Sequence, residues 1–263
     1  MKKIVNFCPT GSETTRENSL APLFPNEIIE EVCRAYDEDL ITLVHVHARD
    51  ENGKPSNKVE HFAPIVEGLR KYCPDLAICT SLSGRYNNTI EARTEVLSLK
   101  PDMGSLTMGS WNYKTGVNIN TPPMILGLIE KMKEYNVIPE IECFDSGMLN
   151  YANHLINKKI LVEPFYINMI FGNISNAQCD IKTIYYILEN KHSDAVMCFG
   201  GIGKQQFAAI DNGLSLANGV RVGLEDNFYS ENGEKATNYY LLNKVKSKKV
   251  EIMKPIEFKN FLK

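Results

Sequence analysis

Short apolar runs alternate with longer amphipathic segments along the whole chain. The apolar runs are rich in β-branched residues, as buried strands are, and the segments between them show helical spacing. The predicted strands cover residues 3–8, 41–47, 76–82, 102–107, 137–143, 161–170, 195–200 and 219–223. The predicted helices cover residues 26–37, 58–71, 88–98, 121–134, 145–158, 176–190, 203–213 and 235–247. The pattern is a strand followed by a helix, repeated eight times.

This alternation predicts a parallel sheet with helices on its faces, because strands that are apolar on both sides need cover from water. Eight strand–helix units in 263 residues favour a closed (β/α)8 barrel, the TIM-barrel fold, as a single domain over residues 1–263. The main alternative, a doubly wound open sheet, would carry a G-x-G-x-x-G turn after its first strand. The turn at residues 9–14 reads PTGSET instead.

The composition narrows the range of partners. A formal net charge of −3 gives no basic field of the kind that neutralises nucleic-acid phosphates. The seven cysteines are an odd number without a C-x-x-C pair, which is typical of reduced thiols in the cytoplasm. The amino-terminal apolar stretch is too short for a signal peptide, and no later run is long enough for a membrane span. We therefore expect a cytoplasmic protein that binds small molecules and neither nucleic acid nor membranes.

Two histidines stand at the end of the second predicted strand. In the stretch VHVHARDENG, residues 44–53, His45 and His47 are two positions apart, so their imidazoles point to the same side of the strand. A single histidine there would more often be a core residue with satisfied hydrogen bonds. Two buried neutral imidazoles would each need their own partners, which favours a shared metal ion.

A third ligand can come from the end of the last strand. Catalytic zinc usually takes three protein ligands and keeps an open position. The stretch GVRVGLEDN, residues 219–227, places Glu225 and Asp226 at the same mouth of a barrel, and either can complete the site. Gly219 and Gly223 suggest close backbone approach at this point rather than a solvated loop.

Four motifs, taken together, resemble the β-keto acid cleavage enzymes. They are T-G-S-E at residues 10–13, H-V-H-A-R-D at 45–50, P-E-I-E-C-F-D at 139–145 and R-V-G-L-E-D-N at 221–227. The last motif is the most specific, and the four span nearly the whole chain. The resemblance implies a zinc-dependent barrel enzyme, a homo-oligomer such as a dimer or tetramer, that converts acetyl-CoA and a β-keto acid into acetoacetate and a new acyl-CoA.

The resemblance also implies roles for individual residues. The metal ligands are His45, His47 and Glu225. The catalytic residues are Asp226 for proton transfer, Arg221 for its orientation, Ser81 and Glu142. The residues that contact the substrate are Glu13, Thr107, Ser83 and Gly84.

Several of these assignments have alternatives. Glu140 shares the strand face of Glu142, so either can be the acidic residue of the pocket. Where many relatives read S-T-G-G, this chain reads Ser81-Leu82-Ser83-Gly84-Arg85, so the functional serine is Ser81 or Ser83, with Ser81 preferred. The fourth strand offers both Ser105 and Thr107, with Thr107 preferred.

Glu13 bears on the identity of the β-keto acid. A carboxylate in an otherwise anion-binding pocket selects a substrate that carries an ammonium group, because an unpaired desolvated carboxylate is costly. This favours 3-keto-5-aminohexanoate, an intermediate of lysine fermentation. The alternative is that Glu13 caps a helix or pairs with Arg16 or Arg49.

The predicted mechanism uses zinc to polarise the ketone of the β-keto acid and Asp226 as the base. The carbanion of acetyl-CoA is the expected nucleophile. For CoA binding, the stretch FGGIGKQQ at residues 199–206 places glycines at the start of a helix, where backbone amides can meet a phosphate. The predicted CoA contacts are Gly201, Gly203 and Lys204, with Lys54 and Arg85 as further candidates.

Two rival functions fit parts of the same pattern. A metal-dependent hydrolase on a TIM barrel also uses an H-x-H pair, but such enzymes place it after the first strand and add histidines at later strand ends. Here His154 falls in a predicted helix, and His192 precedes the seventh strand at the opposite end of the barrel. A non-catalytic binding barrel is the second rival, and a complete set of candidate ligands with a candidate base disfavours it.

Overall fold

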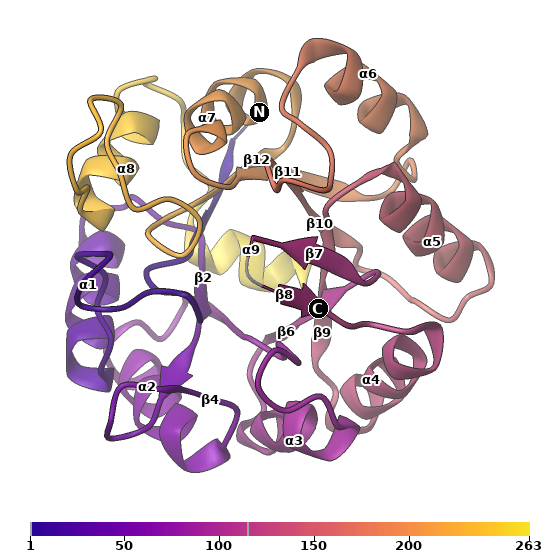
Figure 1. The fold of residues 1–263 in the computed structure, drawn as a ribbon, viewed down its shortest axis with the longest axis horizontal. Coiled ribbons are helices and arrows are strands. Elements are labelled where there is room, and N and C mark those ends of the chain that lie inside the picture. The colour runs from indigo at the N-terminus through magenta and orange to yellow at the C-terminus, as the bar shows by residue number, and fades with distance from the viewer. Residues whose placement is uncertain (1, 115) are drawn as a thin grey trace.

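The computed structural model describes residues 2–114 and 116–263. Within these residues, eight parallel strands close into a barrel, and the neighbours around the ring follow the order β1, β12, β11, β10, β9, β6, β5 and β2 (Figure 1). Their bounds are β1 (Ile4–Phe7), β2 (Leu43–Val46), β5 (Ala77–Thr80), β6 (Met103–Thr107), β9 (Ile138–Cys143), β10 (Tyr166–Phe171), β11 (Val196–Gly201) and β12 (Gly219–Val222). The predicted (β/α)8 barrel is confirmed.

Helices surround the barrel and bury its outer face (Figure 1). They are α1 (Pro25–Asp37), α2 (Val59–Tyr72), α3 (Ile90–Thr94) with the 3-10 turn η1 (Glu95–Leu99), α4 (Pro122–Tyr135), α5 (Ser146–Asn157), α6 (Ile181–Asn190), α7 (Gln205–Leu216) and α8 (Asn238–Lys246). Several begin at a side chain that accepts a backbone N–H of the first turn, which satisfies an otherwise unpaired donor. These caps are Thr89, Thr121, Asp145, Asp180 and Thr237.

The side chains that face the inside of the barrel form layers, because alternate residues of each strand point inward. The layer near the amino ends of the strands is apolar and includes Ile4, Leu43, Ala77, Met103 and Tyr166. The next layer is polar although it is fully buried, and it contains Asn6, His45, Glu140 and Asn168. The chemistry of the chain is therefore concentrated in the half of the barrel near the carboxyl ends of the strands.

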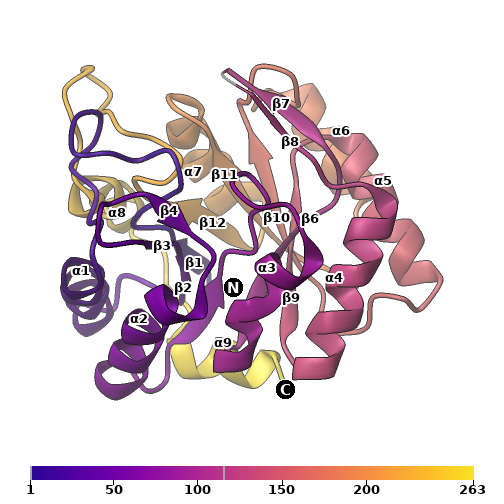
Figure 2. The ribbon, with the colours of Figure 1, turned by 60° about the horizontal axis from the view of Figure 1, so that its bottom comes forward.

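A last helix, α9 (Pro255–Phe261), closes the amino-terminal end of the barrel. Phe258 is completely buried, and its ring lies 5.3 Å from that of Tyr166, edge to face. Figure 2 shows α9 at the bottom of the molecule, at the opposite end from β7 (Trp111–Tyr113) and β8 (Gly116–Asn118). The carboxyl-terminal tail thus packs on its own barrel.

The structure corrects two predicted boundaries. The strand predicted over residues 161–170 begins at Tyr166, because Pro164 has no N–H for the sheet ladder and residues 161–165 stay outside it. The helix predicted over 176–190 begins at Ile181, where Asp180 provides the cap. Residues 176–180 instead form part of the loop that leaves the barrel at β10.

Two short hairpins were not predicted. One pairs β3 (Ala48–Arg49) with β4 (Pro55–Ser56), and the other pairs β7 with β8 across the mouth of the barrel (Figure 1). Across the described residues, no helix is both long enough and apolar enough to cross a membrane. All seven cysteines are free thiols.

Candidate active site

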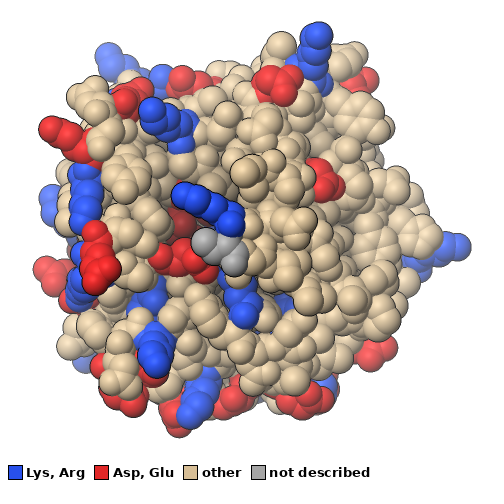
Figure 3. Space-filling model, viewed as in Figure 1, with Lys and Arg blue, Asp and Glu red and all other residues tan. Residues whose placement is uncertain are grey.

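A cavity of about 730 Å³ opens at the carboxyl ends of the strands. Its wall includes residues from the loop after β1, from β2, β6 and β9, and from the loop after β12. Figure 3 shows the hollow at the centre of this face, with acidic atoms inside it and basic side chains beside it. Because ligands bind at this end of parallel barrels, the cavity is the candidate active site.

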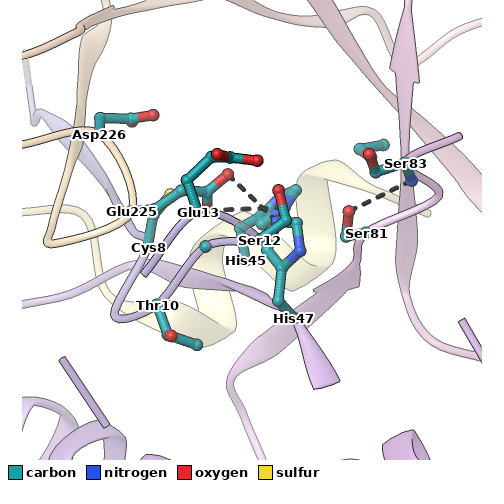
Figure 4. Close-up of polar contacts among 12 residues, drawn as sticks. Cys8, Thr10, Ser12, Glu13, His45, His47, Ser81, Ser83, Glu225 and Asp226 are labelled. Atoms are coloured by element: carbon teal, nitrogen blue, oxygen red, sulfur yellow. Dashed lines mark hydrogen bonds and ion pairs between the residues drawn. The ribbon is translucent and has the colours of Figure 1, made fainter. Parts of the chain in front are cut away.

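The three predicted metal ligands converge in this cavity. The Nε2 atoms of His45 and His47 lie 3.3 Å apart. Glu225 reaches them from the other side, with Oε1 3.2 Å from Nε2 of His47 and Oε2 3.8 Å from Nε2 of His45. Figure 4 shows the three side chains pointing toward one another. One ligand atom from each lies within 4.8 Å of the others, so a single ion can contact all three.

Close backbone packing brings Glu225 to the histidines although 178 residues separate it from His47. Strand β1 lies between β2 and β12, and the Glu225 amide donates to the carbonyl of Cys8 at the end of β1. A Cβ atom at Gly223 would lie 2.1 Å from that carbonyl oxygen, and one at Gly11 would lie 2.5 Å from Cγ of Glu225. Both glycines are therefore required for the approach, which accounts for their places in the T-G-S-E and R-V-G-L-E-D-N motifs.

Glu140 holds His45 on the side that faces away from the cavity. Its carboxylate accepts hydrogen bonds from His45 Nδ1 at 2.5 Å, Cys79 Sγ at 2.9 Å, Asn6 Nδ2 at 2.5 Å and Asn168 Nδ2 at 2.7 Å. Because Nδ1 of His45 faces this carboxylate, Nε2 is left to face the cavity. A carboxylate that fixes the far nitrogen of a metal-binding histidine is the usual arrangement in zinc sites.

The electrostatics of this cluster favour a cation. Burial lowers the pKa of His45, but the carboxylates of Glu225 and Glu140 outweigh it and raise the pKa to about 9. Burial raises the pKa of Glu140, yet the charges of His45 and Arg221 bring it down to about 2. In addition, Glu225 Oε2 is buried without a hydrogen-bond partner among the described residues. A divalent ion between the three ligands would supply both the missing charge and the missing partner.

Arg221 connects the acidic residues beside the metal ligands. From β12, and almost completely buried, it contacts Asp226 Oδ2 at 2.8 Å, Glu142 Oε1 at 3.1 Å and Glu225 Oε1 at 2.6 Å. Burial raises the pKa of Asp226, and the charge of Arg221 opposes that rise without cancelling it. Asp226 is therefore a stronger base than an exposed aspartate, and Arg221 holds it in one orientation.

The alternative hydroxyls have different hydrogen-bond partners in the structure. Thr107 lines the cavity and donates to Glu142 at 2.9 Å, whereas the Ser105 hydroxyl accepts the backbone N–H of Leu82 at 3.0 Å. Both residues line the cavity, so the preference for Thr107 over Ser105 stays a prediction. Ser81 and Ser83 both line the cavity, and the Ser81 hydroxyl accepts the amide of Ser83 (Figure 4).

Of the predicted binding residues Gly84, Gly201, Gly203 and Lys204, only Gly203 is part of the cavity wall. Gly203 is part of the cavity wall, where its amide donates to the carbonyl of Asp226 at 2.7 Å. Lys204 is exposed just before α7 and is not part of the wall. Gly84 packs against Asn88, and Gly201 packs against the backbone of Gln205, so both lie behind the cavity surface.

Glu13 lines the cavity on the side of the loop after β1, where its partner is neither Arg16 nor Arg49. Its carboxylate accepts hydrogen bonds from Arg85 Nη1 at 3.0 Å and from the hydroxyl of Tyr86 at 3.3 Å. Arg16 pairs with Glu27 instead. The alternative pairings with Arg16 and Arg49 are therefore not formed, and the role of Glu13 in binding the substrate stays a prediction.

Two features of the site were missed. The support that Glu140 gives His45 depends on the position of β9 across the barrel, and only its spacing from Glu142 hinted at an inward orientation. Trp111 and Tyr113, on the β7–β8 hairpin, also form part of the cavity wall. The single tryptophan of the chain, placed just after a strand end, was the available signal.

The fold and the site define the class of protein: a parallel barrel enzyme with a candidate metal centre and an Arg221–Asp226 pair at the carboxyl-terminal mouth. A family model described as beta-keto acid cleavage enzyme matches residues 2–261. The chain belongs to the β-keto acid cleavage enzyme family.

Similar proteins agree with this assignment. The 3-keto-5-aminohexanoate cleavage enzyme of Acetoanaerobium sticklandii is 30% identical over 97% of this chain and 94% of its own length. The 3-oxoadipate:acetyl-CoA acetyltransferase of Cupriavidus necator is 33% identical over 85% of this chain and 80% of its own length. The apo structure of ObcA has a TM-score of 0.74 at 16% identity, covering 92% of this chain and 65% of that longer one, which supports the fold alone.

Proposed function

We propose that the protein is a zinc-dependent enzyme that converts a β-keto acid and acetyl-CoA into acetoacetate and a new acyl-CoA. The observation that carries the proposal is the convergence of His45, His47 and Glu225 in one cavity with the Arg221–Asp226 pair beside them. The names of relatives such as the 3-oxoadipate:acetyl-CoA acetyltransferase support acetyl-CoA as the second substrate.

Zinc bound by His45, His47 and Glu225 would polarise the ketone of the β-keto acid. Arg221 keeps Asp226 ionised and oriented, and Glu142 holds the other side of the same guanidinium. Thr107 fixes Glu142 from the neighbouring strand, so these side chains form one rigid unit. Ser81, which follows β5, also lines the cavity and is the proposed donor to a substrate oxygen.

The atom balance of the reaction decides which proton Asp226 removes. Acetoacetate joins the acetyl group of acetyl-CoA to the CH2–COO unit of the β-keto acid. The new bond therefore forms at C2 of the β-keto acid, and the carbanion must be at C2. This differs from the carbanion of acetyl-CoA that we expected from the sequence. Asp226 takes the C2 proton, and C2 attacks the thioester carbonyl and releases the CoA thiolate. The thiolate then adds to the C3 carbonyl, the C2–C3 bond breaks, and Asp226 returns the proton to C2.

Acetyl-CoA enters from the open mouth of the cavity. Lys204 before α7 is the proposed contact for its phosphates, since a lysine favours anions, and Gly203 beside it leaves the cavity wall free of a side chain at this point. Gly201, the last residue of β11, allows the close approach of the Gln205 backbone at the start of α7. We further propose that the protein works in the cytoplasm. We also propose that it forms a homo-oligomer, which light scattering can test.

Two β-keto acids are candidates for the first substrate. Glu13 in the cavity wall and the 30% identical Acetoanaerobium sticklandii enzyme support 3-keto-5-aminohexanoate, whose ammonium group a carboxylate can bind. Arg85 in the same wall and the 33% identical Cupriavidus necator enzyme support 3-oxoadipate, which ends in a second carboxylate.

The reaction is tested by mixing the protein with acetyl-CoA and a panel of β-keto acids and measuring acetoacetate and acyl-CoA by mass spectrometry. In the Asp226→Asn variant we expect kcat to fall by about 10²- to 10⁴-fold, because the base is lost while the metal ligands remain. Asp194→Asn, at an exposed position far from the cavity, is the matched control and should keep full activity. Release of hydrolysis products without acyl-CoA would instead identify a metal-dependent hydrolase.

A further inference from the structure

Arg85 occupies the loop after β5, directly beyond the serines of the active site, at the position where this chain departs from the S-T-G-G pattern. Its side chain is only 14% exposed although it lies at the rim of the cavity. Burying a guanidinium costs free energy unless its contacts compensate for the lost water. Its contacts therefore indicate what the rim is built to bind.

Two segments that are far apart in the sequence hold the guanidinium. Nη1 donates to Ser12 Oγ at 3.1 Å and to Glu13 Oε1 at 3.0 Å, both in the loop after β1. From the β7–β8 hairpin, the rings of Trp111 and Tyr113 lie 5.2 Å and 4.5 Å from the guanidinium carbon, within cation–π range. Arg85 is thus fixed in one place at the outer end of the cavity.

The pairing with Arg85 makes Glu13 a poorer binding site for a substrate ammonium group. Arg85 offsets its negative charge, and the hydroxyl of Tyr86 donates to the same carboxylate oxygen. A substrate ammonium that approached Glu13 would lie next to the guanidinium that is already bound to Oε1. Like charges at that distance repel, so the closed Glu13–Arg85 pair disfavours an aminated tail.

The same arrangement favours an anionic tail. Both hydrogen bonds of the guanidinium are made by Nη1, and among residues 2–114 and 116–263 the Nε and Nη2 atoms have no hydrogen-bond acceptor. A guanidinium with two unused donor groups can form two parallel hydrogen bonds to the two oxygens of one carboxylate. Lys114, on the turn of the β7–β8 hairpin, also lines the cavity and adds positive charge to this end.

We propose that Arg85 is a specificity-determining residue that binds a distal carboxylate of the substrate, so that the preferred substrates are β-keto dicarboxylic acids. The metal cluster at the inner end of the cavity takes the keto acid group, and Arg85 at the outer end takes the second carboxylate. This inference rests on the proposed function, because it assumes that a β-keto acid occupies the cavity.

The test compares three six-carbon β-keto acids that differ only in the tail: 3-oxoadipate, 3-keto-5-aminohexanoate and 3-ketohexanoate. We expect the wild-type protein to show the highest kcat/KM for 3-oxoadipate. In Arg85→Gln the ratio of kcat/KM for 3-oxoadipate to that for 3-ketohexanoate should fall about 10- to 100-fold, as expected for a lost charged hydrogen bond. In Arg85→Lys the ratio should lie between those of the wild type and Arg85→Gln, because lysine keeps the charge but cannot form the paired hydrogen bonds to a carboxylate.

Two further variants make the result specific. Glu13→Gln removes the anion that competes for Arg85, so the same ratio should rise, whereas a Glu13 that binds ammonium would show its loss only with 3-keto-5-aminohexanoate. Arg16→Gln is the matched control, because Arg16 is exposed, pairs with Glu27 and is not part of the cavity wall. It should leave the ratio unchanged.

The dissociation constants of the three β-keto acids are also measured by calorimetry without acetyl-CoA, which separates binding from turnover. If no acyl-CoA forms but 3-oxoadipate binds best and Arg85→Gln removes the preference, the proposed reaction fails and the role of Arg85 stands. An unchanged ratio in Arg85→Gln would overturn the inference, as would an effect confined to the KM of acetyl-CoA. A wild-type preference for the aminated substrate would overturn it as well.

Discussion

At the scale of single residues, the position of His45 depends on Glu140. That carboxylate is fully buried and accepts four hydrogen bonds, one of them from His45 Nδ1. In Glu140→Gln the imidazole loses its anionic partner. We expect zinc affinity to fall about 10- to 100-fold, as for other changes behind a metal-binding histidine. A competition titration with a chromophoric chelator measures it.

The control for this variant is Glu60→Gln, at an exposed position on α2. Thermal unfolding of both variants separates loss of the fold from loss of the metal. Zinc affinity equal to that of the wild type in a folded Glu140→Gln protein would show that Glu140 does not support His45.

The cluster of His45, His47 and Glu225 could be predicted from the sequence and the resemblance, whereas the different positions of the two glutamates of β9 could not. His45 and His47 are revealed by their spacing at a strand end. Glu140 and Glu142 share one face, and their roles follow from the register of the barrel. Glu140 lies level with Ser105 in the lower layer, and Glu142 lies level with Thr107 at the cavity. That register depends on strand pairing over distances along the chain that local patterns do not encode.

At the scale of secondary-structure elements, Asn238 ties α8 to the loops that carry the site. It is buried at the first turn of α8, where its Oδ1 accepts the amide of Leu224 at 2.8 Å and its Nδ2 donates to the carbonyl of Pro9 at 2.9 Å. The same Nδ2 donates to Glu31 on α1. These contacts join the loop after β1 to the loop that holds Glu225.

Replacing Asn238 with leucine removes all three hydrogen bonds and leaves buried partners unpaired. We expect the free energy of unfolding to fall by about 2 kcal/mol or more, measured by urea denaturation. Asn243→Leu, on the exposed side of the same helix, should change it by less than about 0.5 kcal/mol. Equal losses in the two variants would mean that Asn238 contributes only helix propensity.

Most strands and helices were predictable, and the exceptions have identifiable causes. Apolar residues continue on both sides of Pro164, so the periodicity alone placed the start of β10 too early. The β7–β8 hairpin consists of two three-residue strands, which are too short to give an alternating pattern. This hairpin supplies Trp111 and Tyr113, so the shape of the cavity rim was less predictable than its floor.

At the scale of the whole molecule, the site exists only because the barrel closes. Strand β1 pairs with both β12 and β2, and this brings the last strand of the barrel beside the first two. His45 and His47 come from one side of β1, and Glu225 comes from the other. Metal binding by these three residues would therefore test the fold as well as the proposed function.

The most direct measurement is the zinc stoichiometry of the purified protein after equilibration with zinc and removal of loosely bound ion, determined by inductively coupled plasma mass spectrometry. We predict one zinc per chain in the wild type and in His154→Ala, whose histidine is exposed on α5. In His47→Ala the bound zinc should be lost, because only two of the three ligands remain. A wild type without stoichiometric zinc, or a His47→Ala variant that keeps it, would contradict the account.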